Sequence, residues 1–369
     1  MTTPIDVVHF KFQIRRKRAI LLFVGSSILI LPTFYLIYKH ANSALLSFAD
    51  DLQNKDDRSA YVKEIYSKNE KVNRESPDKD YGESLWNQKK RGYEIPLNQD
   101  VPLSHDNHST YYMHADGTLG LDFHCGTCAY IPSSGRLIGT GVGAEIDRND
   151  CVIRMNVAPV KTFEEDYGYK TTIRVLCFMS APGMIKDDVM TGRSAPERMI
   201  FWGVHPLKQP RAYRITLEAM KTYPDIKYYF FRPETEGWAG ELFESETGVT
   251  RLGSNSWLST GWFAMIMAFD ICDEINVYGM IHDDYCGQHP NDTAPFHYYG
   301  IYLNKTECGY YEKSEKMLKG GHRFITEKAV FGKWATEHNV NFYYPSWDDY
   351  RFNKTMDTPF VMRDRSGFT

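Results

Sequence analysis

Two small polar sites follow strand-like apolar runs in this chain, and their residue types suit contacts with a phosphate or a nucleotide. Ser133 opens a Ser-Ser-Gly turn after residues 129–132, and Asn156 ends the apolar run 151–155. A hydroxyl and backbone N–H groups in such a turn can bind an anion, and an amide side chain both donates and accepts. An ordinary turn at Ser133 and a turn-capping role for Asn156 remain open as alternatives.

Two helix starts carry further polar groups. Ser259, Thr260 and Gly261 precede the helix-like run 262–270, where free N–H groups and the helix dipole favour an anion. His322 precedes a second helix-like run, RFITE. The dipole disfavours an imidazolium there, and a neutral imidazole is what a general base requires. On spacing alone, a solvent-facing histidine is the alternative.

A glycine-rich segment imitates a dinucleotide-binding fingerprint. Gly139, Gly141 and Ala144 form the pattern GxGxxA, and Glu164 follows at about the expected spacing of 20 residues. Only Arg-Leu-Ile precedes the first glycine, which is too short for a buried strand. An NAD(P)-dependent luminal oxidoreductase is therefore the remote alternative for the function.

The elements that position these residues alternate between strand-like and helix-like patterns. Strands are expected at 129–132, 151–155, 172–178, 199–204, 227–231, 274–278 and 340–344, and helices at 212–223, 261–270 and 324–338. This alternation predicts an α/β fold with a Rossmann-like, mainly parallel sheet flanked by helices. Ligands of such sheets bind beyond the carboxyl ends of the strands, where the polar residues would converge.

The N-terminal part predicts a membrane anchor followed by a stem. Residues 19–37 are uncharged, which at 1.5 Å per residue just spans a bilayer core, and five basic residues precede them. The positive-inside rule then gives a cytosolic tail at 1–18, a transmembrane signal anchor at 19–38 and a luminal remainder. A cleaved signal peptide is the alternative. Residues 39–118 are polar and charge-rich, as in a stem, and 119–369 are long and apolar enough to form one globular domain.

Cysteines, sequons and charge agree with a luminal domain. All seven cysteines lie after residue 120, which predicts disulfides and at least one unpaired thiol. Cys125-Gly-Thr-Cys128 has no second ligand pair, so a zinc site is disfavoured. The net charge of −4, without a basic block outside the tail, excludes a nucleic-acid partner. Glycosylation sequons occur at Asn107, Asn291, Asn304 and Asn353.

Four segments together resemble a known family. Residues 128–156 and 258–279, HYYG from His297 and HRFITE from His322 are similar to the large, small, III and very small sialylmotifs of eukaryotic sialyltransferases. LSTGWF, INVYGM and PFHYYG look like the branch that attaches sialic acid α2,6 to N-acetylgalactosamine (GalNAc). The resemblance implies a variant of the GT-A glycosyltransferase fold in a Golgi membrane protein of type II. It also implies inverting transfer from CMP-sialic acid to an O-glycan or a ganglioside.

The resemblance also implies roles for individual residues. His322 would be the catalytic base, and the residues that bind the donor would be Ser133, Asn156, Ser259, Thr260, Gly261 and His297. It pairs Cys128 with Cys272 and Cys286 with Cys308, and it leaves Cys125–Cys151 as a further suggestion. Two positions depart from relatives, because Cys177 replaces an Asn that assists the nucleotide and Gly300 replaces an acidic residue in HYYG.

No cofactor and no metal are expected. Asp78-Lys79-Asp80 is the only Asp-x-Asp sequence, and it lies in the presumed stem. The departing CMP is a good leaving group, and His297 with helix-start N–H groups would stabilise its charge. A luminal type II glycan-binding protein, or an inactive relative, is the second hypothesis. The intact Ser133 and His322 count against it, and Gly300 counts slightly for it.

Overall fold

The structure is a computed structural model that describes residues 95, 102–104, 107–185, 189–299 and 305–348. All of them belong to one unit of the chain, Asp57–Thr369. The predicted cytosolic tail, the anchor at 19–38 and most of the stem lie outside the described residues. Within the described residues, no helix is both long enough and apolar enough to cross a bilayer.

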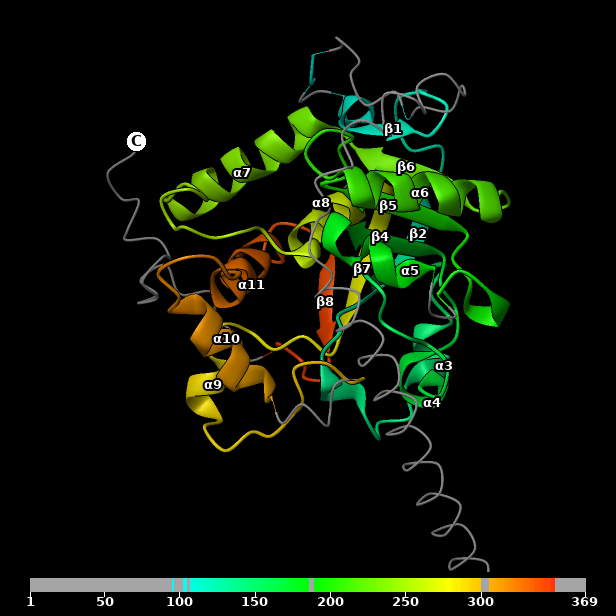
Figure 1. The fold of residues 1–369 in the computed structure, drawn as a ribbon. Helices are drawn as coiled ribbons and strands as arrows, with labels where there is room; N and C mark the ends of the chain where they lie inside the picture. Colours follow the sequence, from blue (N-terminus) through cyan, green and yellow to red (C-terminus); the bar gives the residue numbers. More distant parts are fainter. Residues whose placement is uncertain (1–94, 96–101, 105–106, 186–188, 300–304, 349–369) are drawn as a thin grey trace, which may run out of the picture. The chain divides into compact units, whose positions relative to one another are not determined.

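One eight-stranded sheet organises the described residues (Figure 1). The order across the sheet is β1-β6-β5-β4-β3-β2-β7-β8, and every neighbouring pair is parallel except β1 with β6. The strands are β1 (Tyr112–His114), β2 (Cys125–Ile131), β3 (Cys151–Met155), β4 (Ile173–Cys177), β5 (Arg198–Trp202), β6 (Lys227–Phe231), β7 (Cys272–Tyr278) and β8 (Val340–Tyr343). The predicted mainly parallel α/β fold is therefore confirmed.

The strand order creates a switch point at β2. The chain adds β3 to β6 on one side of β2 and then returns to place β7 on its other side. Loops that leave β2 and its two neighbours thus part at the carboxyl edge of the sheet. Open α/β sheets bind ligands at such a switch point.

Helices cover both faces of this sheet (Figure 1). Because successive side chains of a strand point to opposite faces, Tyr229 and Phe231 of β6 join one core and Tyr228 and Phe230 join another. The α-helices are α3 (Gly143–Ile146), α4 (Glu164–Tyr167), α5 (Ala181–Met184), α6 (Pro210–Thr222), α7 (Pro233–Thr247), α8 (Thr260–Ile271), α9 (Tyr285–Gln288), α10 (Glu307–Glu315) and α11 (Phe324–Trp334). The first core packs against α7, α8 and α11, and the second against α5 and α6.

Helix α8 is the central helix of the first core. Nine of its twelve residues are buried, which explains why its sequence is apolar on every side instead of on one stripe. Ser259 caps its start, because the hydroxyl oxygen accepts a hydrogen bond from the Trp262 N–H at 3.1 Å. The apolar core around α8 therefore fixes the position of the Ser259-Thr260-Gly261 segment.

The three proposed disulfides are all present. Cys125–Cys151 joins β2 to β3, Cys128–Cys272 joins β2 to β7, and Cys286–Cys308 joins α9 to α10, with Cα–Cα distances of 6.0, 6.0 and 5.4 Å. Cys177 is the free cysteine, as the odd count required. Two of these disulfides thus link β2, the strand at the switch point, to its neighbours β3 and β7.

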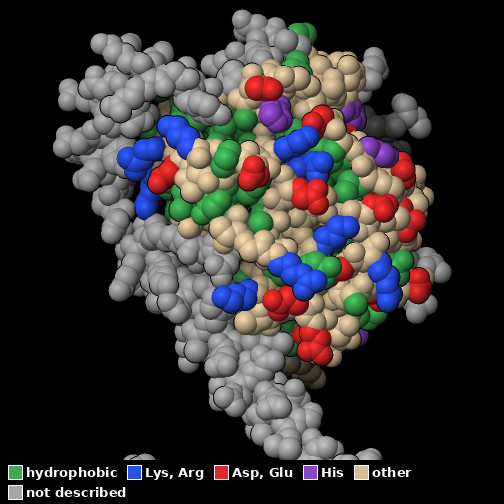
Figure 2. All heavy atoms as spheres, turned by 90° about the vertical axis from the view of Figure 1, so that its right-hand side faces the viewer, with side chains coloured by type: hydrophobic (Ala, Val, Ile, Leu, Met, Phe, Trp, Pro, Cys, Tyr) green, Lys and Arg blue, Asp and Glu red, His purple; other side chains and the backbone are tan. Residues whose placement is uncertain are grey.

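The face of the molecule shown in Figure 2 carries charges of both signs. On the face shown in Figure 2, acidic and basic side chains lie interspersed among apolar ones. A nucleic-acid-binding face would instead gather lysines and arginines in one patch or stripe.

Candidate functional site

The turn after β2 is bonded directly to the segment that carries His297. The Tyr298 N–H donates to the Ser133 carbonyl at 3.0 Å, and the Gly135 N–H donates to the Pro295 carbonyl at 2.9 Å. A Cβ on Gly135 would lie only 2.6 Å from Pro295 Cδ, so only glycine allows this approach. The structure therefore brings Ser133 and His297 together, as predicted.

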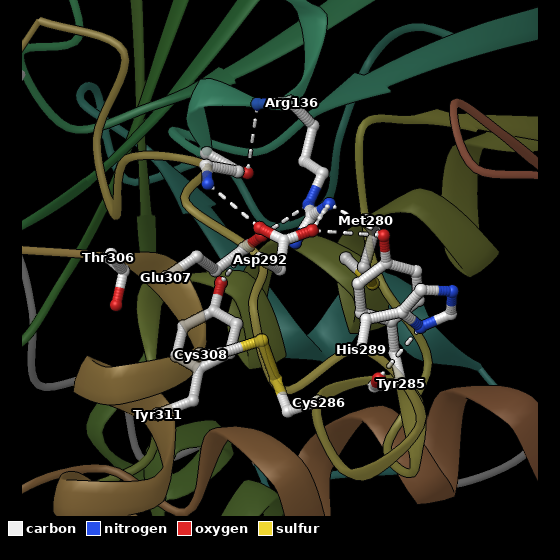
Figure 3. Close-up of polar contacts among 12 residues, drawn as sticks. Arg136, Met280, Tyr285, Cys286, His289, Asp292, Thr306, Glu307, Cys308 and Tyr311 are labelled. Carbon is white, nitrogen blue, oxygen red and sulfur yellow. Dashed lines mark hydrogen bonds and ion pairs between the residues drawn. A yellow bond between two sulfur atoms is a disulfide. The ribbon is translucent and has the colours of Figure 1, made fainter.

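The Arg136 side chain joins the same two segments (Figure 3). Its Nη1 donates to an Asp292 carboxylate oxygen at 2.6 Å, and its Nε donates to Glu307 at 2.8 Å. The Tyr285 hydroxyl accepts a further bond from Nη1 at 2.9 Å, and the guanidinium also lies 4.5 Å from the Tyr285 ring centroid. Glu307 in turn accepts from the Tyr311 hydroxyl at 2.8 Å. This network, the Arg136 clamp, joins the Ser133 turn to both ends of the loop that holds His297.

His297 is held neutral by its surroundings. Its ring stacks on Phe296 and on Tyr299, with centroids 4.1 and 4.9 Å apart. Burial, with a smaller effect from the Lys305 ammonium, lowers the pKa of His297 to about 4. A neutral imidazole can donate one hydrogen bond to an anion without itself carrying a charge. Gly300, the last residue of HYYG, lies outside the described residues.

Asn156 connects the β3 end with the start of α8. Its backbone φ of +50° is left-handed, a conformation that asparagine adopts more readily than most residues. Its side-chain oxygen accepts from the Cys177 N–H at 3.1 Å and from the Thr260 hydroxyl at 3.4 Å. Arg174 donates to the Asn156 carbonyl at 2.8 Å and so fixes the turn. Cys177 thus contributes its backbone N–H to this contact, and not its side chain.

Ser133 and Asn156 belong to the same edge of the sheet. Ile131 of β2 pairs with Arg154 of β3 in a parallel register, so each chain reaches its polar residue two positions later. Parallel strands leave their ends at one edge, and the predicted convergence of the two residues follows from this register.

The start of α8 is clamped by a carboxylate from α11. The Ser259 N–H donates to Glu327 Oε1 at 2.9 Å, and the Ser259 hydroxyl donates to the other carboxylate oxygen. Burial raises the pKa of Glu327. The first N–H groups of a helix have no intrahelical partner, so those of Thr260 and Gly261 are not used within α8. The Ser259 hydroxyl is already engaged, so it supports the helix start instead of facing a ligand directly.

His322 has the hydrogen-bonding pattern of a general base. Its Nδ1 lies 2.8 Å from the Trp257 carbonyl, which can only accept, so Nδ1 carries the hydrogen. The unprotonated Nε2 is therefore left to accept a proton. Ser314 holds the backbone on both sides, since its Oγ accepts from the His322 N–H at 3.0 Å and donates to the His322 carbonyl at 2.8 Å. Burial lowers the pKa of His322, so the ring is neutral as predicted.

Hydrogen bonds connect His322 with the start of α8. Trp257, which holds the His322 ring, precedes Thr260 by three residues, and Glu327 ties Ser259 to the helix that follows His322. Sequence reasoning proposed six donor-binding residues and a base, which remain predictions, but it missed the residues that support them here, Arg136, Arg174 and Glu327. Glu327 is the last residue of the HRFITE segment. That position is the one feature of the sequence that could have indicated its role.

The dinucleotide alternative is wrong. The Gly139 and Gly141 N–H groups both donate to the Asp166 carboxylate, at 2.8 and 2.9 Å, and so are not open to a pyrophosphate. A Cβ on Gly143 would lie 2.0 Å from the Glu164 carbonyl oxygen. A 3₁₀ turn, Gly135–Leu137, precedes the segment where a Rossmann fingerprint needs a strand.

One cluster in the described residues could hold a metal ion. His282, Asp283 and Asp284 each place a ligand atom within 4.8 Å of the others. They follow β7 and were not singled out from the sequence, while Asp78 and Asp80 lie outside the described residues. Such acidic groups are common without a metal, so the cluster alone does not indicate a metal site.

Two of the four glycosylation sequons are at the surface. Asn107 and Asn291 are exposed, and Asn304 and Asn353 lie outside the described residues.

Comparison with known proteins gives consistent matches. The model of Glycosyltransferase family 29 (sialyltransferase) matches residues 121–339. Alpha-N-acetylgalactosaminide alpha-2,6-sialyltransferase 3 of Rattus norvegicus is 40% identical over 234 residues, which are 62% of this chain and 75% of that protein. Alpha-N-acetyl-neuraminyl-2,3-beta-galactosyl-1,3-N-acetyl-galactosaminide alpha-2,6-sialyltransferase of Homo sapiens is 39% identical over 244 residues, or 65% and 80% of the two chains.

Among solved structures, a mammalian sialyltransferase aligns with 73% of this chain and 87% of its own. The sequence identity is 18% and the TM-score is 0.40.

Proposed function

The chain belongs to glycosyltransferase family 29, the sialyltransferases, and from this membership we propose that it transfers sialic acid from CMP-sialic acid to the 6-hydroxyl of a GalNAc residue. The α2,6 linkage and the GalNAc acceptor follow from the names of relatives that are about 40% identical. The observation that carries the mechanism is the His322 ring, whose Nδ1 donates to the Trp257 carbonyl, so that Nε2 is the unprotonated nitrogen of the neutral ring.

The reaction begins with proton removal from the acceptor. Nε2 of His322 takes the proton of the 6-hydroxyl while the oxygen attacks the anomeric carbon of sialic acid. The bond from that carbon to the CMP phosphate oxygen breaks, and CMP leaves with the electron pair. Attack from the face opposite CMP inverts the anomeric centre. General base catalysis of this kind contributes about 10²–10⁴-fold to the rate.

The leaving phosphate meets several preorganised donors. The Thr260 and Gly261 N–H groups at the start of α8 and the neutral imidazole of His297 supply hydrogen bonds to its oxygens. Asn156 and the Ser133 turn hold the remainder of the nucleotide. Fixed donors that face developing negative charge are usually the largest single contribution to transition-state stabilisation. We therefore expect activity without a divalent metal.

The acceptor is an O-glycan or a ganglioside. The human relative is named for a sialylated Gal-GalNAc acceptor, which supports an acceptor that already carries sialic acid. With its N-terminal anchor and luminal catalytic domain, the enzyme would act at the Golgi membrane as a single-pass type II protein.

The test is a product assay on the full-length protein in detergent. We incubate it with CMP-sialic acid and a panel of sialylated and unsialylated O-glycans and ganglioside head groups, and we determine masses and linkages by mass spectrometry. The proposal predicts one added sialic acid in α2,6 linkage to GalNAc. Tight glycan binding without any product would instead identify a glycan-binding protein, and transfer to galactose alone would overturn the acceptor assignment.

A further inference from the structure

Exposed apolar side chains gather on two loops beside His322. Nine large hydrophobic residues are exposed in the described part of the chain, and four of them lie in residues 250–257 and 316–321. They are Leu252 (76% exposed), Trp257 (58%), Met317 (38%) and Leu318 (87%). Clustered apolar exposure marks a surface that contacts a partner or a membrane. We call these two loops, with their side chains, the Trp257–Leu318 surface.

The two loops are bonded into one unit. The Trp257 N–H donates to the Gly321 carbonyl at 2.9 Å, and the Gly320 N–H donates to the Asn255 carbonyl at 2.8 Å. The Asn255 side-chain amide reaches the Leu318 carbonyl at 2.6 Å. The same unit holds the catalytic ring through the Trp257 carbonyl, so the apolar side chains have a fixed relation to His322.

Charge on this surface is only positive. Lys316 and Lys319 are exposed on either side of Met317 and Leu318, and the Arg251 guanidinium lies 5.0 Å from the Trp257 ring centroid. Neither residues 249–259 nor residues 316–323 include an acidic residue. The neighbouring acid Glu315 is buried and bonded to Thr326, so it does not offset these charges at the surface.

We propose that the Trp257–Leu318 surface docks on a lipid bilayer made negative by sialylated glycolipids, which presents the acceptor to His322. Aliphatic tips flanked by lysines, with one tryptophan, are the composition of membrane-interface segments. A site for sugar alone would carry hydrogen-bonding side chains in place of Leu252 and Leu318. This inference rests on the proposed function, because the acceptor must lie in the membrane that the surface contacts.

The first test measures membrane contact without activity. Full-length protein is reconstituted in phosphatidylcholine vesicles that contain a sialylated ganglioside, and brominated acyl chains are used to quench tryptophan fluorescence. The chain has seven tryptophans, and none lies in residues 19–38. We expect quenching that Trp257→Phe removes and that Leu252→Ser with Leu318→Ser weakens. Equal quenching of the wild type and Trp257→Phe would overturn the proposal.

The second test compares two forms of one acceptor. For the Leu252→Ser/Leu318→Ser variant we expect kcat/KM to fall at least tenfold on vesicle-borne ganglioside but less than twofold on its free oligosaccharide. Lys316→Glu with Lys319→Glu should lower the vesicle rate by more than about 25-fold, since each lysine near an anionic membrane contributes about fivefold. Leu207→Ser, at a position that is 84% exposed and outside both loops, is the matched control.

The outcomes separate the two proposals. An equal loss of kcat/KM on vesicle-borne ganglioside and on free oligosaccharide would show that the surface contacts the glycan. An unchanged kcat/KM on both acceptor forms would show that the surface contacts neither the glycan nor the membrane. Both results contradict docking. Absence of transfer by the wild type to any acceptor would refute the proposed function, while the quenching measurement would still decide whether this surface enters the bilayer.

Discussion

The Arg136 clamp allows a quantitative prediction for Arg136→Met. Arg136 is largely buried and pairs with two carboxylates, Asp292 at 2.6 Å and Glu307 at 2.8 Å. Methionine keeps much of the side-chain volume but leaves both carboxylates without their cation. Removing one partner of a buried ion pair costs about 3–5 kcal/mol. Because the wild-type Nη2 is already buried without a partner, we expect the lower end of this range, about 3 kcal/mol.

This loss should be visible in a thermal melt. For a domain of this size, 1 kcal/mol shifts Tm by about 2–4 °C, so Arg136→Met should lower Tm by roughly 6–12 °C. Lys227→Met is the matched control, because the Lys227–Asp122 pair is exposed and such pairs contribute at most about 1 kcal/mol. Both variants are measured as full-length protein in detergent. A Tm shift no larger than that of the control would refute the clamp.

The pH dependence of the difference has a definite sign. Burial raises the pKa of Asp292, but hydrogen bonds from Arg136 and Ala294 and the Arg136 charge outweigh it, so the pKa lies below its usual value. Because the pKa of Asp292 is lower in the folded than in the unfolded state, this carboxylate stabilises the folded protein fully at pH values above its unfolded-state pKa of about 3.9. That stabilisation is lost as the pH falls through the folded-state pKa. The difference in Tm between wild type and Arg136→Met should therefore narrow below about pH 4.

The KM for CMP-sialic acid should also be higher in Arg136→Met, because the clamp positions the His297 segment.

Three further predictions follow from the site and the sheet. His297→Ala should raise KM for CMP-sialic acid and lower kcat by about 10–100-fold, because a hydrogen bond to a charged group is worth about 1.5–3 kcal/mol; unchanged steady-state kinetics would contradict this. Replacing Cys128 and Cys272 by Ser opens a loop of 144 residues, which the chain-entropy model values at about 5 kcal/mol, so Tm should fall steeply in a melt without reductant. Initial rates should persist in excess EDTA, whereas loss of activity restored by Mn²⁺ would point to a metal, with the His282 cluster as its first candidate.

The buried strands were predictable because their sequences are short apolar runs. β3 and β6 have the predicted bounds, since parallel strands covered on both faces read as continuous hydrophobic segments. β2 begins at Cys125, four residues before the prediction, because its pairing with β7 starts at Cys125–Cys272. Tertiary pairing therefore set a boundary that the local polarity of Gly126 and Thr127 concealed.

Helix α7 was missed for a local reason. Its sequence is rich in charges and holds Gly237 and Gly240, which disfavour a helix interior. No atom lies within 4 Å of a Cβ built on either glycine, so packing there does not require them. The packing of Ala239 and Phe243 into the core outweighs the weak propensity.

The candidate site residues could be proposed from the sequence, but the contacts that hold them in place could not. Ser133, Asn156 and His322 stand at the ends of recognisable elements. The Arg136–Glu307 and Ser259–Glu327 contacts join residues 171 and 68 positions apart, and only the folded sheet brings them together. No single-sequence pattern contains that information.

The central claim is that His322 removes the acceptor proton during sialyl transfer. Its most direct test is the turnover of His322→Ala, with CMP affinity and Tm measured on the same sample. We expect the kcat of His322→Ala to fall by about 10²–10⁴-fold while CMP binding is kept. For the wild type we expect kcat/KM to decrease only below the free-histidine pKa of about 6.5, because burial lowers the pKa of His322. Wild-type turnover by a correctly folded His322→Ala would contradict the account.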